Sequence, residues 1–298
     1  MGNPKRFFEI DFLCEKNQLY RLASKKKNVV QCFQKSDIPI NQGGFIMKIG
    51  AQLYTIREFM QTSEDFANAM KKIAEMGYEY VQVSAISQDI PAEEIAEVCK
   101  ANGLEIAITH PPFDLLKDHT QKVIENHKIM GAKYVGLGAM PWGTGNSKQG
   151  YVDFVKDFTP IAKMIKEAGL QFMYHNHDFE FTRFDNQTGL EYLADHLPDA
   201  GFTLDTFWIQ AGGADPTVWL KKLAGRVDVI HLKDFVIVDG QRRMAEVLEG
   251  NLNWDGIFEA AKAAGVKYAL IEQDDCYGKD PFECLRTSLE NLKKYGIA

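Results

Sequence analysis

Hydrophobic and polar positions follow one repeated order along most of the chain. The order is the end of an amphipathic helical stretch, then a glycine, then an apolar run of about six residues. Five phrases have it: EMGYEYVQVS (75–84), ANGLEIAITH (101–110), IMGAKYVGLG (129–138), EAGLQFMYHN (167–176) and AAGVKYALIE (263–272). A glycine there suits the left-handed residue that ends a helix. A short apolar run is typical of a parallel strand that is buried on both faces.

Three further apolar runs, at 48–53, 201–205 and 227–232, extend this pattern. Helical periodicity fills the gaps, near 63–76, from 91 onward, and near 118–130, 150–168, 188–196, 216–223, 254–264 and 280–294. Eight strands alternating with eight helices predict an all-parallel α/β fold. We expect a (β/α)8 TIM barrel that forms a single domain over residues 47–298. A doubly wound open sheet usually has a Gly-rich phosphate loop after its first strand, whereas YTIREFMQ (54–61) follows here.

The first 46 residues lack both periodic patterns. They hold eight Lys/Arg residues, including the run 25–27, against four Asp/Glu residues. At Met47 the pattern changes abruptly to the apolar opening MKIGAQLYT. We interpret residues 1–46 as an irregular N-terminal extension that is either not native or poorly ordered. A basic arm that reaches a partner is the alternative.

Composition narrows the class of protein. The net charge of −7 argues against a nucleic-acid partner. The five cysteines are scattered without a CxxC pair, so a disulfide framework is not expected. No apolar run approaches the ~20 residues of a membrane span, and no secretory signal is visible. We therefore expect a cytoplasmic protein with a small-molecule partner and no membrane partner, and a homo-oligomer stays possible.

Polar residues at the predicted strand ends carry the candidate chemistry. Catalysis in a barrel takes place where the C-terminal ends of the strands meet. These ends carry Gln52, Gln82, His110, His175 with Asn176 and His177, Asp205, His231, and Glu272 with Gln273. Asp, His and Glu converging there would bind one Mn, Co, Zn or Fe ion per chain, although each could instead be structural. His119 and His127 fall in a helical stretch and are predicted at the surface.

Several phrases together resemble a known family. LDTFW (204–208), HLKD (231–234) and IEQD (271–274), with the opening IGAQLYT (49–55), are similar to the xylose isomerase-like TIM-barrel superfamily. That group holds sugar phosphate isomerases/epimerases, inosose dehydratase, ketose 3-epimerases and endonuclease IV. The resemblance covers residues 47–298. It implies that Asp205, His231 and Glu272 are metal ligands from the sixth, seventh and eighth strands.

The fifth strand departs from the family pattern. Its phrase FMYHNHDFEF (172–181) has His175 where the family has a metal-binding Glu. A 3-epimerase of the family uses two carboxylates on opposite faces of a ketose, and His175 breaks that pair. His175 either ligates the metal or acts as a base, and Glu180 is a candidate replacement carboxylate. The candidate metal ligands are therefore His175, Asp205, His231 and Glu272, with His175 in the position where the family has Glu.

The residues for proton handling and substrate binding are assigned from the strand-end positions and the family resemblance. The candidate catalytic residues are Glu272, His175, His177 and Lys233, and the candidate substrate-binding residues are Gln52, His110, Trp142, Trp208 and Gln273. We expect a divalent-metal-dependent sugar isomerase or epimerase that deprotonates a ketose, polyol or keto-sugar α to a carbonyl. An inosose dehydratase-like or keto-glycoside lyase, and a non-catalytic sugar-binding barrel, are the alternatives. No Gly-rich phosphate cradle is present, which favours a free sugar over a sugar phosphate.

The nuclease branch of the family fits poorly. That branch binds three zinc ions and has a second His shortly after the sixth-strand Asp, where this chain has Phe207 and Trp208. The ligand count therefore falls short of a trinuclear cluster.

Overall fold

The described residues form a closed barrel of eight parallel strands. The computed structural model describes residues 47–297, so the predicted extension at 1–46 lies outside the described residues. The strand order around the barrel is β1-β12-β9-β8-β5-β4-β3-β2. The strands are β1 (Lys48–Gln52), β2 (Tyr80–Ser84), β3 (Glu105–His110), β4 (Tyr134–Leu137), β5 (Gln171–His175), β8 (Gly201–Asp205), β9 (Val229–Leu232) and β12 (Tyr268–Ile271). This order confirms the predicted (β/α)8 TIM barrel.

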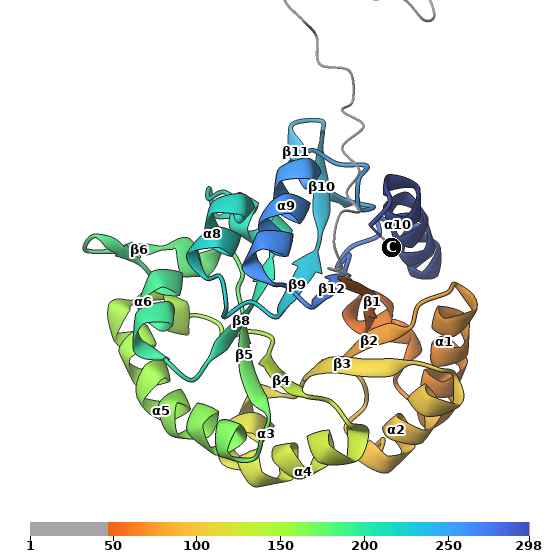
Figure 1. Ribbon diagram of the computed structural model, residues 1–298, viewed down its shortest axis with the longest axis horizontal. Coiled ribbons are helices and arrows are strands. Elements are labelled where there is room, and N and C mark those ends of the chain that lie inside the picture. The colour runs from red at the N-terminus through yellow and green to blue at the C-terminus, as the bar shows by residue number, and fades with distance from the viewer. Residues whose placement is uncertain (1–46, 298) are drawn as a thin grey trace, which may run out of the picture. The chain divides into compact units, whose positions relative to one another are not determined.

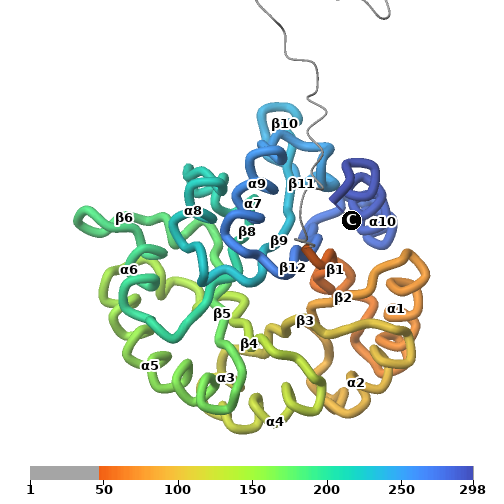
Figure 2. Tube along the Cα trace, in the orientation of Figure 1, coloured from red at the N-terminus to blue at the C-terminus, as the bar shows by residue number. Residues whose placement is uncertain are grey.

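Helices form a ring outside the strands (Figure 1). They are α1 (Ser63–Glu75), α2 (Ala92–Ala101), α3 (Phe113–Asp118), α4 (Thr120–Met130), α5 (Lys148–Glu167), α6 (Gly189–His196), α7 (Thr206–Ala211), α8 (Pro216–Lys222), α9 (Trp254–Ala264) and α10 (Pro281–Tyr295). Short 3-10 helices lie at η1 (Leu53–Phe59), η2 (Thr144–Asn146) and η3 (Phe179–Phe181). In the tube view, the chain passes from the central strands to the outer helices and returns to the next strand (Figure 2). None of the helices described has the length and apolar character needed to cross a membrane.

The repeated glycines end helices as the sequence predicts. Their φ angles are positive at Gly77, Gly103, Gly131, Gly169 and Gly265, between 68° and 93°. Each lies shortly after a helix and before a strand, so the chain turns there in a conformation that residues with a Cβ adopt at a cost.

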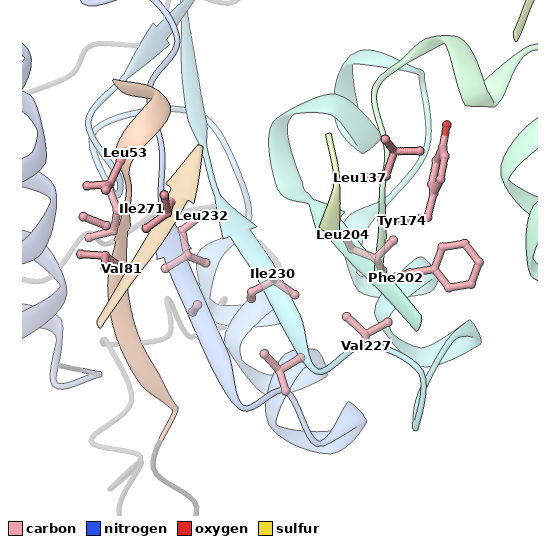
Figure 3. Packing of buried hydrophobic residues seen from close by; sticks show 14 of the residues in the cluster. Leu53, Val81, Leu137, Tyr174, Phe202, Leu204, Val227, Ile230, Leu232 and Ile271 are labelled. Carbon is pink, nitrogen blue, oxygen red and sulfur yellow. The ribbon is translucent and has the colours of Figure 1, made fainter. Parts of the chain in front are cut away.

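The barrel has two apolar layers separated by its wall of strands. Side chains on the outer face of the wall, among them Tyr174, Phe202 and Leu204, pack under the helices in the large core cluster (Figure 3). A smaller cluster comprises Ala107, Ile108, Tyr134, Met173, Val229 and Leu270. Strand alternation places this second cluster inside the barrel. The two layers leave the inner positions at the strand ends for polar side chains.

Two hairpins enlarge the mouth of the barrel, by which we mean the end formed by the C-terminal ends of the strands. The hairpin of β6 (Arg183–Phe184) and β7 (Gln187–Thr188) follows strand β5, and the hairpin of β10 (Asp234–Val238) and β11 (Gln241–Ala245) follows strand β9. Asp234 anchors the second one, because its buried carboxylate accepts hydrogen bonds from the backbone N–H groups of residues 235, 248, 250 and 252 and from the Trp254 indole. The periodic pattern of the sequence did not predict either hairpin.

Candidate metal centre and mouth of the barrel

Strand alternation brings four predicted ligands to one place inside the barrel. His175, His231 and Glu272 each lie two residues after an inner apolar residue, namely Met173, Val229 and Leu270. Side chains two residues apart on a strand point to the same face, so these three point into the barrel as the apolar residues do. Each of the four residues His175, Asp205, His231 and Glu272 offers one donor atom, and these atoms all lie within 4.8 Å of one another. We call these four residues the ligand group.

Hydrogen bonds behind the two imidazoles fix which nitrogen faces the cluster. His175 donates from Nδ1 to the carbonyl oxygen of Gly138 at 2.8 Å. His231 donates from Nε2 to Gln82 Oε1, also at 2.8 Å. Because both acceptors are carbonyl oxygens, the bonded nitrogens carry the protons. His175 Nε2 and His231 Nδ1 are left with free lone pairs, which is how a metal-ligating histidine is held by its second nitrogen.

The two carboxylates are held in the same way. Asp205 Oδ1 accepts from the backbone N–H of Trp208 at 2.9 Å and caps helix α7. Glu272 Oε1 accepts from Gln52 Nε2 at 2.8 Å. This places Gln52, a predicted substrate-binding residue, behind Glu272. Asp205 Oδ2 and Glu272 Oε2 remain directed toward the histidines.

The four free donor atoms fit a divalent metal ion. His231 Nδ1 lies 2.9 Å from Glu272 Oε2 and 3.7 Å from Asp205 Oδ2, and His175 Nε2 lies 3.4 Å from that same oxygen. Both His231 Nδ1 and Glu272 Oε2 are buried, and Lys233 Nζ lies 3.1 Å from that carboxylate oxygen. Buried carboxylates need balancing positive charge, and a divalent ion would add to the charge that Lys233 supplies. A set of two imidazoles and two carboxylates suits Mn, Fe, Co or Zn.

Lys233 lies beside the ligand group and carries a charge. Its Nζ is 3.3 Å from Asp205 Oδ2, 3.1 Å from Glu272 Oε2 and 2.8 Å from Asp274 Oδ2. Burial acts to lower the pKa of Lys233, but the three carboxylates outweigh it and raise that pKa. Burial likewise acts to raise the pKa of Asp205, yet Lys233 and His175 hold it well below its ordinary value. The lysine is therefore a fixed cation in the mouth.

Asp274 is a residue of the mouth that the sequence reasoning did not select. It occurs in the IEQD phrase two positions after Glu272, which is the signal that would have found it. Burial and the neighbouring Glu272 raise its pKa to about 7. Its Oδ1 is buried without a hydrogen-bond partner, while Oδ2 binds Lys233. Asp274 and Lys233 thus form a second layer, one strand step nearer the solvent than Glu272 and His231.

His177 and Trp208 line the mouth from the fifth and sixth strands. The His177 ring centroid lies 4.8 Å from that of His175 and 5.2 Å from that of Trp208, and it stacks on Phe179 at 5.6 Å. Burial and the nearby His175 lower the pKa of His177 to about 3, so the ring is neutral. Its Nδ1 has no hydrogen-bond partner within residues 47–297. Lys233 Nζ lies 5.3 Å from the centre of the Trp208 ring.

Of the other predicted substrate-binding residues, His110 and Gln273 are at the strand ends, and Trp142 is on an exposed loop. His110 is in the mouth, with its ring 5.6 Å from that of His175, and a Cβ at Gly136 would lie 2.5 Å from His110 Cδ2. Glycine at 136 therefore makes room for the His110 ring. Gln273 is buried and has an unpartnered Oε1. Trp142 is 94% exposed on the loop after β4, where its ring lies 6.4 Å from that of Phe179.

Glu180, the candidate replacement carboxylate, is not part of the ligand group. It is fully buried and accepts from the Tyr174 hydroxyl at 2.6 Å and from the His177 backbone N–H at 2.7 Å. Tyr174 faces the outer apolar layer. His127, predicted at the surface, is also buried, and its Nε2 lies 2.8 Å from Thr109 Oγ1.

Comparison with protein families identifies the fold group. A model of the xylose isomerase-like TIM barrel matches residues 70–295. The chain belongs to this family. No sequence among curated proteins matches it.

Solved structures share the barrel at low sequence identity. A sugar phosphate isomerase/epimerase from Parabacteroides distasonis ATCC 8503 is 21% identical, with a TM-score of 0.71 over 87% of this chain and 97% of that one. The probable 3-DHS dehydratase AsbF from Bacillus anthracis is 16% identical, with a TM-score of 0.63 over 83% and 99%. A D-allulose 3-epimerase from Methylomonas sp. is 15% identical, with a TM-score of 0.63 over 84% and 98%. Similarity at this level shows the fold.

Proposed function

We propose that the protein is a divalent-metal-dependent sugar isomerase or epimerase that removes a proton α to a carbonyl. One observation carries this proposal: four donor atoms from His175, Asp205, His231 and Glu272 meet inside the barrel, each freed by a hydrogen bond on its far side. Structural capping of strand ends needs no such convergence. Similarity to a D-allulose 3-epimerase and a sugar phosphate isomerase/epimerase supports the reaction class.

The metal would supply Lewis-acid stabilisation of the negative charge that develops on a carbonyl oxygen during deprotonation. His175 and Glu272 are predicted both as ligands and as proton-handling groups. Since their free atoms face the ligand group, we assign both to the metal.

Two other side chains remain for proton handling. Among the described residues His177 Nδ1 has no hydrogen-bond partner and the ring is neutral, so its lone pair is available to a substrate proton in the mouth. Service as a base requires bound metal and substrate to raise the low pKa of this ring toward the working pH. Lys233 is a fixed cation beside the ligand group, so it can bind or protonate a sugar oxygen. Asp274 holds the Lys233 ammonium in place at 2.8 Å.

The charge of the mouth favours an uncharged sugar. The buried carboxylates of Asp205 and Glu272 and the partly ionised Asp274, whose pKa is about 7, surround the ammonium of Lys233. Between one and two negative charges therefore remain for a divalent ion to balance. In the described mouth loops, Arg57, Arg183 and Arg242 each donate to backbone carbonyl oxygens, and Arg243 lies over the Tyr277 ring. A phosphate dianion beside the buried carboxylates would add negative charge to a group that Lys233 and a divalent ion already balance. Trp142, Trp208, His110 and Gln273 are proposed to contact the sugar.

Elimination is the second candidate reaction. His175 takes the place of a carboxylate, so the mouth lacks the symmetric carboxylate pair of a 3-epimerase, and the fold is shared with a probable dehydratase. A dehydratase or keto-glycoside lyase would begin with the same α-deprotonation and then expel a β-oxygen substituent. Lys233 could protonate that leaving oxygen.

Metal content and proton exchange test the proposal together. We expect about one Mn, Co, Zn or Fe per chain by elemental analysis, and metal-dependent deuterium uptake at the α-carbon of a ketose or keto-sugar in D2O. Asp205→Asn should lose both. A metal-free protein that cannot be reloaded and exchanges no α-proton would favour a sugar-binding barrel, and about three zinc ions per chain would favour the nuclease branch. Loss of a β-substituent after exchange would identify the elimination reaction.

A further inference from the structure

Glu180 is a fully buried carboxyl group for which the proposed reaction gives no task. It lies in η3, five residues after His175, and both of its oxygens have a partner. Oε1 accepts from the Tyr174 hydroxyl at 2.6 Å, and Oε2 accepts from the backbone N–H of His177 at 2.7 Å. Burying a carboxyl group costs free energy unless its hydrogen bonds recover that cost. Its position therefore calls for a reason other than packing.

The two partners of Glu180 lie on opposite sides of the barrel wall. Tyr174 is on the outer face of β5, where its ring contacts those of Phe154 and Phe202 at centroid distances of 5.5 and 6.5 Å. The next residue, His175, faces the interior, and His177 follows in the mouth. Glu180 thus connects a rigid outer anchor to the backbone of the loop that crosses the strand end.

The backbone of His177 is held on both of its polar groups. Its N–H donates to Glu180, and its carbonyl oxygen accepts from Asn176 Nδ2 at 3.2 Å. Asn176 Oδ1 in turn accepts from the N–H of Asp205 at 3.1 Å. With the backbone held in this way, the His177 ring stacks on Phe179 and lies 5.2 Å from the Trp208 ring.

We propose that Glu180 is a positioning residue: it ties the loop after strand β5 to Tyr174 and so fixes the imidazole of His177 in the mouth. This inference rests on the proposed function, because His177 handles a proton there. Glu180 does not touch the reacting atoms, since Tyr174 and the His177 N–H engage both of its oxygens. It therefore does not replace the carboxylate that strand five lacks.

A carboxyl or carboxamide group suits this position, and an apolar side chain does not. The side chain must accept from the His177 N–H, and Gln offers one oxygen for that bond. Leu has nearly the same size but leaves the N–H buried without an acceptor. The matched pair Glu180→Gln and Glu180→Leu therefore separates the hydrogen bond from the volume.

Tyrosine variants supply a second matched pair. Tyr174→Phe removes only the hydroxyl that anchors Glu180. Tyr78→Phe removes a buried tyrosine hydroxyl that donates to the Leu285 carbonyl at 2.8 Å, at the N-terminal end of β2 and far from the mouth. Both substitutions delete one buried hydrogen bond, so a loss of activity in Tyr174→Phe alone is not a general effect of instability.

The experiment measures the position of His177 and the turnover in the metal-loaded protein. In NMR spectra we expect nuclear Overhauser contacts between the His177 and Trp208 rings in the wild type and in Glu180→Gln, and their loss in Glu180→Leu. Turnover, followed as α-proton exchange of the sugar in D2O, should fall about 10- to 100-fold in kcat in Glu180→Leu. KM should stay within about 3-fold, and the metal content near one per chain.

The outcomes separate the two proposals. Retained ring contacts or retained kcat in Glu180→Leu would overturn the positioning role. A lower kcat in Tyr78→Phe equal to that in Tyr174→Phe would also overturn it, because the effect would then be general. If the wild type exchanges no α-proton, the proposed function fails, while the His177–Trp208 contacts in the same variants still decide whether Glu180 positions the ring.

Discussion

His231 and Gln82 are joined across the interior of the barrel, with His231 Nε2 donating to Gln82 Oε1 at 2.8 Å. The two residues come from β9 and β2, which are separated by β12 and β1 in the closed strand order. The bond leaves His231 Nδ1 facing Glu272 Oε2 at 2.9 Å, and, against the effect of burial, Glu272 and Asp205 raise the pKa of His231. The orientation of the His231 ring is therefore set by a residue outside the four candidate ligands.

Replacement of Gln82 should weaken metal binding. Gln82→Leu removes the acceptor, so the His231 ring is free to adopt the other tautomer, and metal affinity should fall about 10- to 100-fold. Gln82→Glu keeps an acceptor oxygen and should retain affinity within about 3-fold. Titration with Co²⁺ or Mn²⁺ by calorimetry measures both variants. Equal affinity in Gln82→Leu and the wild type would show that the bond does not hold the ligand.

Asp205→Asn separates the metal-binding role of Asp205 from its structural role. The amide oxygen of Asn can still accept from the Trp208 N–H, so helix α7 keeps its cap, which is worth about 1 kcal/mol. The negative charge that faces His175 and His231 is lost. We expect less than about a tenth of the wild-type metal content with an unchanged circular dichroism spectrum. A variant that keeps full metal content and activity would remove Asp205 from the ligand set.

The barrel and the ligand group follow from local patterns in the sequence. Helix-glycine-strand phrases fix the order of elements, and strand alternation then places every second residue of an apolar run inside the barrel. His175, Asp205 and His231 are polar residues at or next to the ends of such runs, which is why they could be named without coordinates. The metal-ligating roles themselves remain proposals.

Contacts that depend on loop conformation could not be predicted from these local sequence patterns. Glu180 lies in a loop, and nothing in FMYHNHDFEF shows that its carboxyl group turns outward to Tyr174. The prediction of His127 at the surface was wrong because its helix, α4, is only weakly amphipathic in sequence, and because Thr109 supplies a buried partner from another element. Asp274 was missed since Lys233, its partner, is 41 residues earlier in the sequence.

The stability of the protein should depend on pH through Glu180. Burial raises its pKa to about 8, from an ordinary value of 4.5, against the opposing effect of hydrogen bonds from Tyr174 and the His177 N–H. Asp178 adds to the increase, and Tyr151 is the other titratable group nearby. A raised pKa means that the folded state holds a proton that the unfolded state releases. Its contribution is fully present below about pH 4.5 and is lost as pH rises through about 8.

Glu180→Gln removes this dependence. The free energy of unfolding of the variant relative to the wild type should rise between pH 4 and pH 9, by up to about 5 kcal/mol. Urea unfolding of both proteins at pH 5, 7 and 9 measures it, and all other titrating groups cancel in the difference. Parallel curves for the two proteins would show that Glu180 has an ordinary pKa.

Trp142 tests whether the exposed aromatic of the mouth contacts the sugar. Its side chain is 94% exposed, so Trp142→Ala should change the free energy of unfolding by less than about 0.5 kcal/mol. Loss of a stacking surface should raise KM several-fold and leave kcat nearly constant. Met164→Ala on α5 is the control, an exposed apolar residue on the outer ring. An unchanged KM would place Trp142 outside the substrate site.

Lys233→Met should destabilise the metal-free protein much more than the metal-bound protein. The ammonium is buried among Asp205, Glu272 and Asp274, and its removal leaves three carboxylates without a cation. Breaking a buried ion pair from one side costs about 3–5 kcal/mol, so the metal-free variant should unfold at a markedly lower temperature. A divalent ion can neutralise the same oxygens, so saturating Mn²⁺ should recover most of the loss, and metal affinity should rise. Thermal unfolding with and without Mn²⁺ measures this, with Lys279→Met, which breaks the ion pair to Glu246, as the control that Mn²⁺ should not rescue. If Mn²⁺ stabilises Lys233→Met no more than it stabilises the wild type, the ammonium and the metal do not share these carboxylates, and Lys233 belongs to a separate structural cluster.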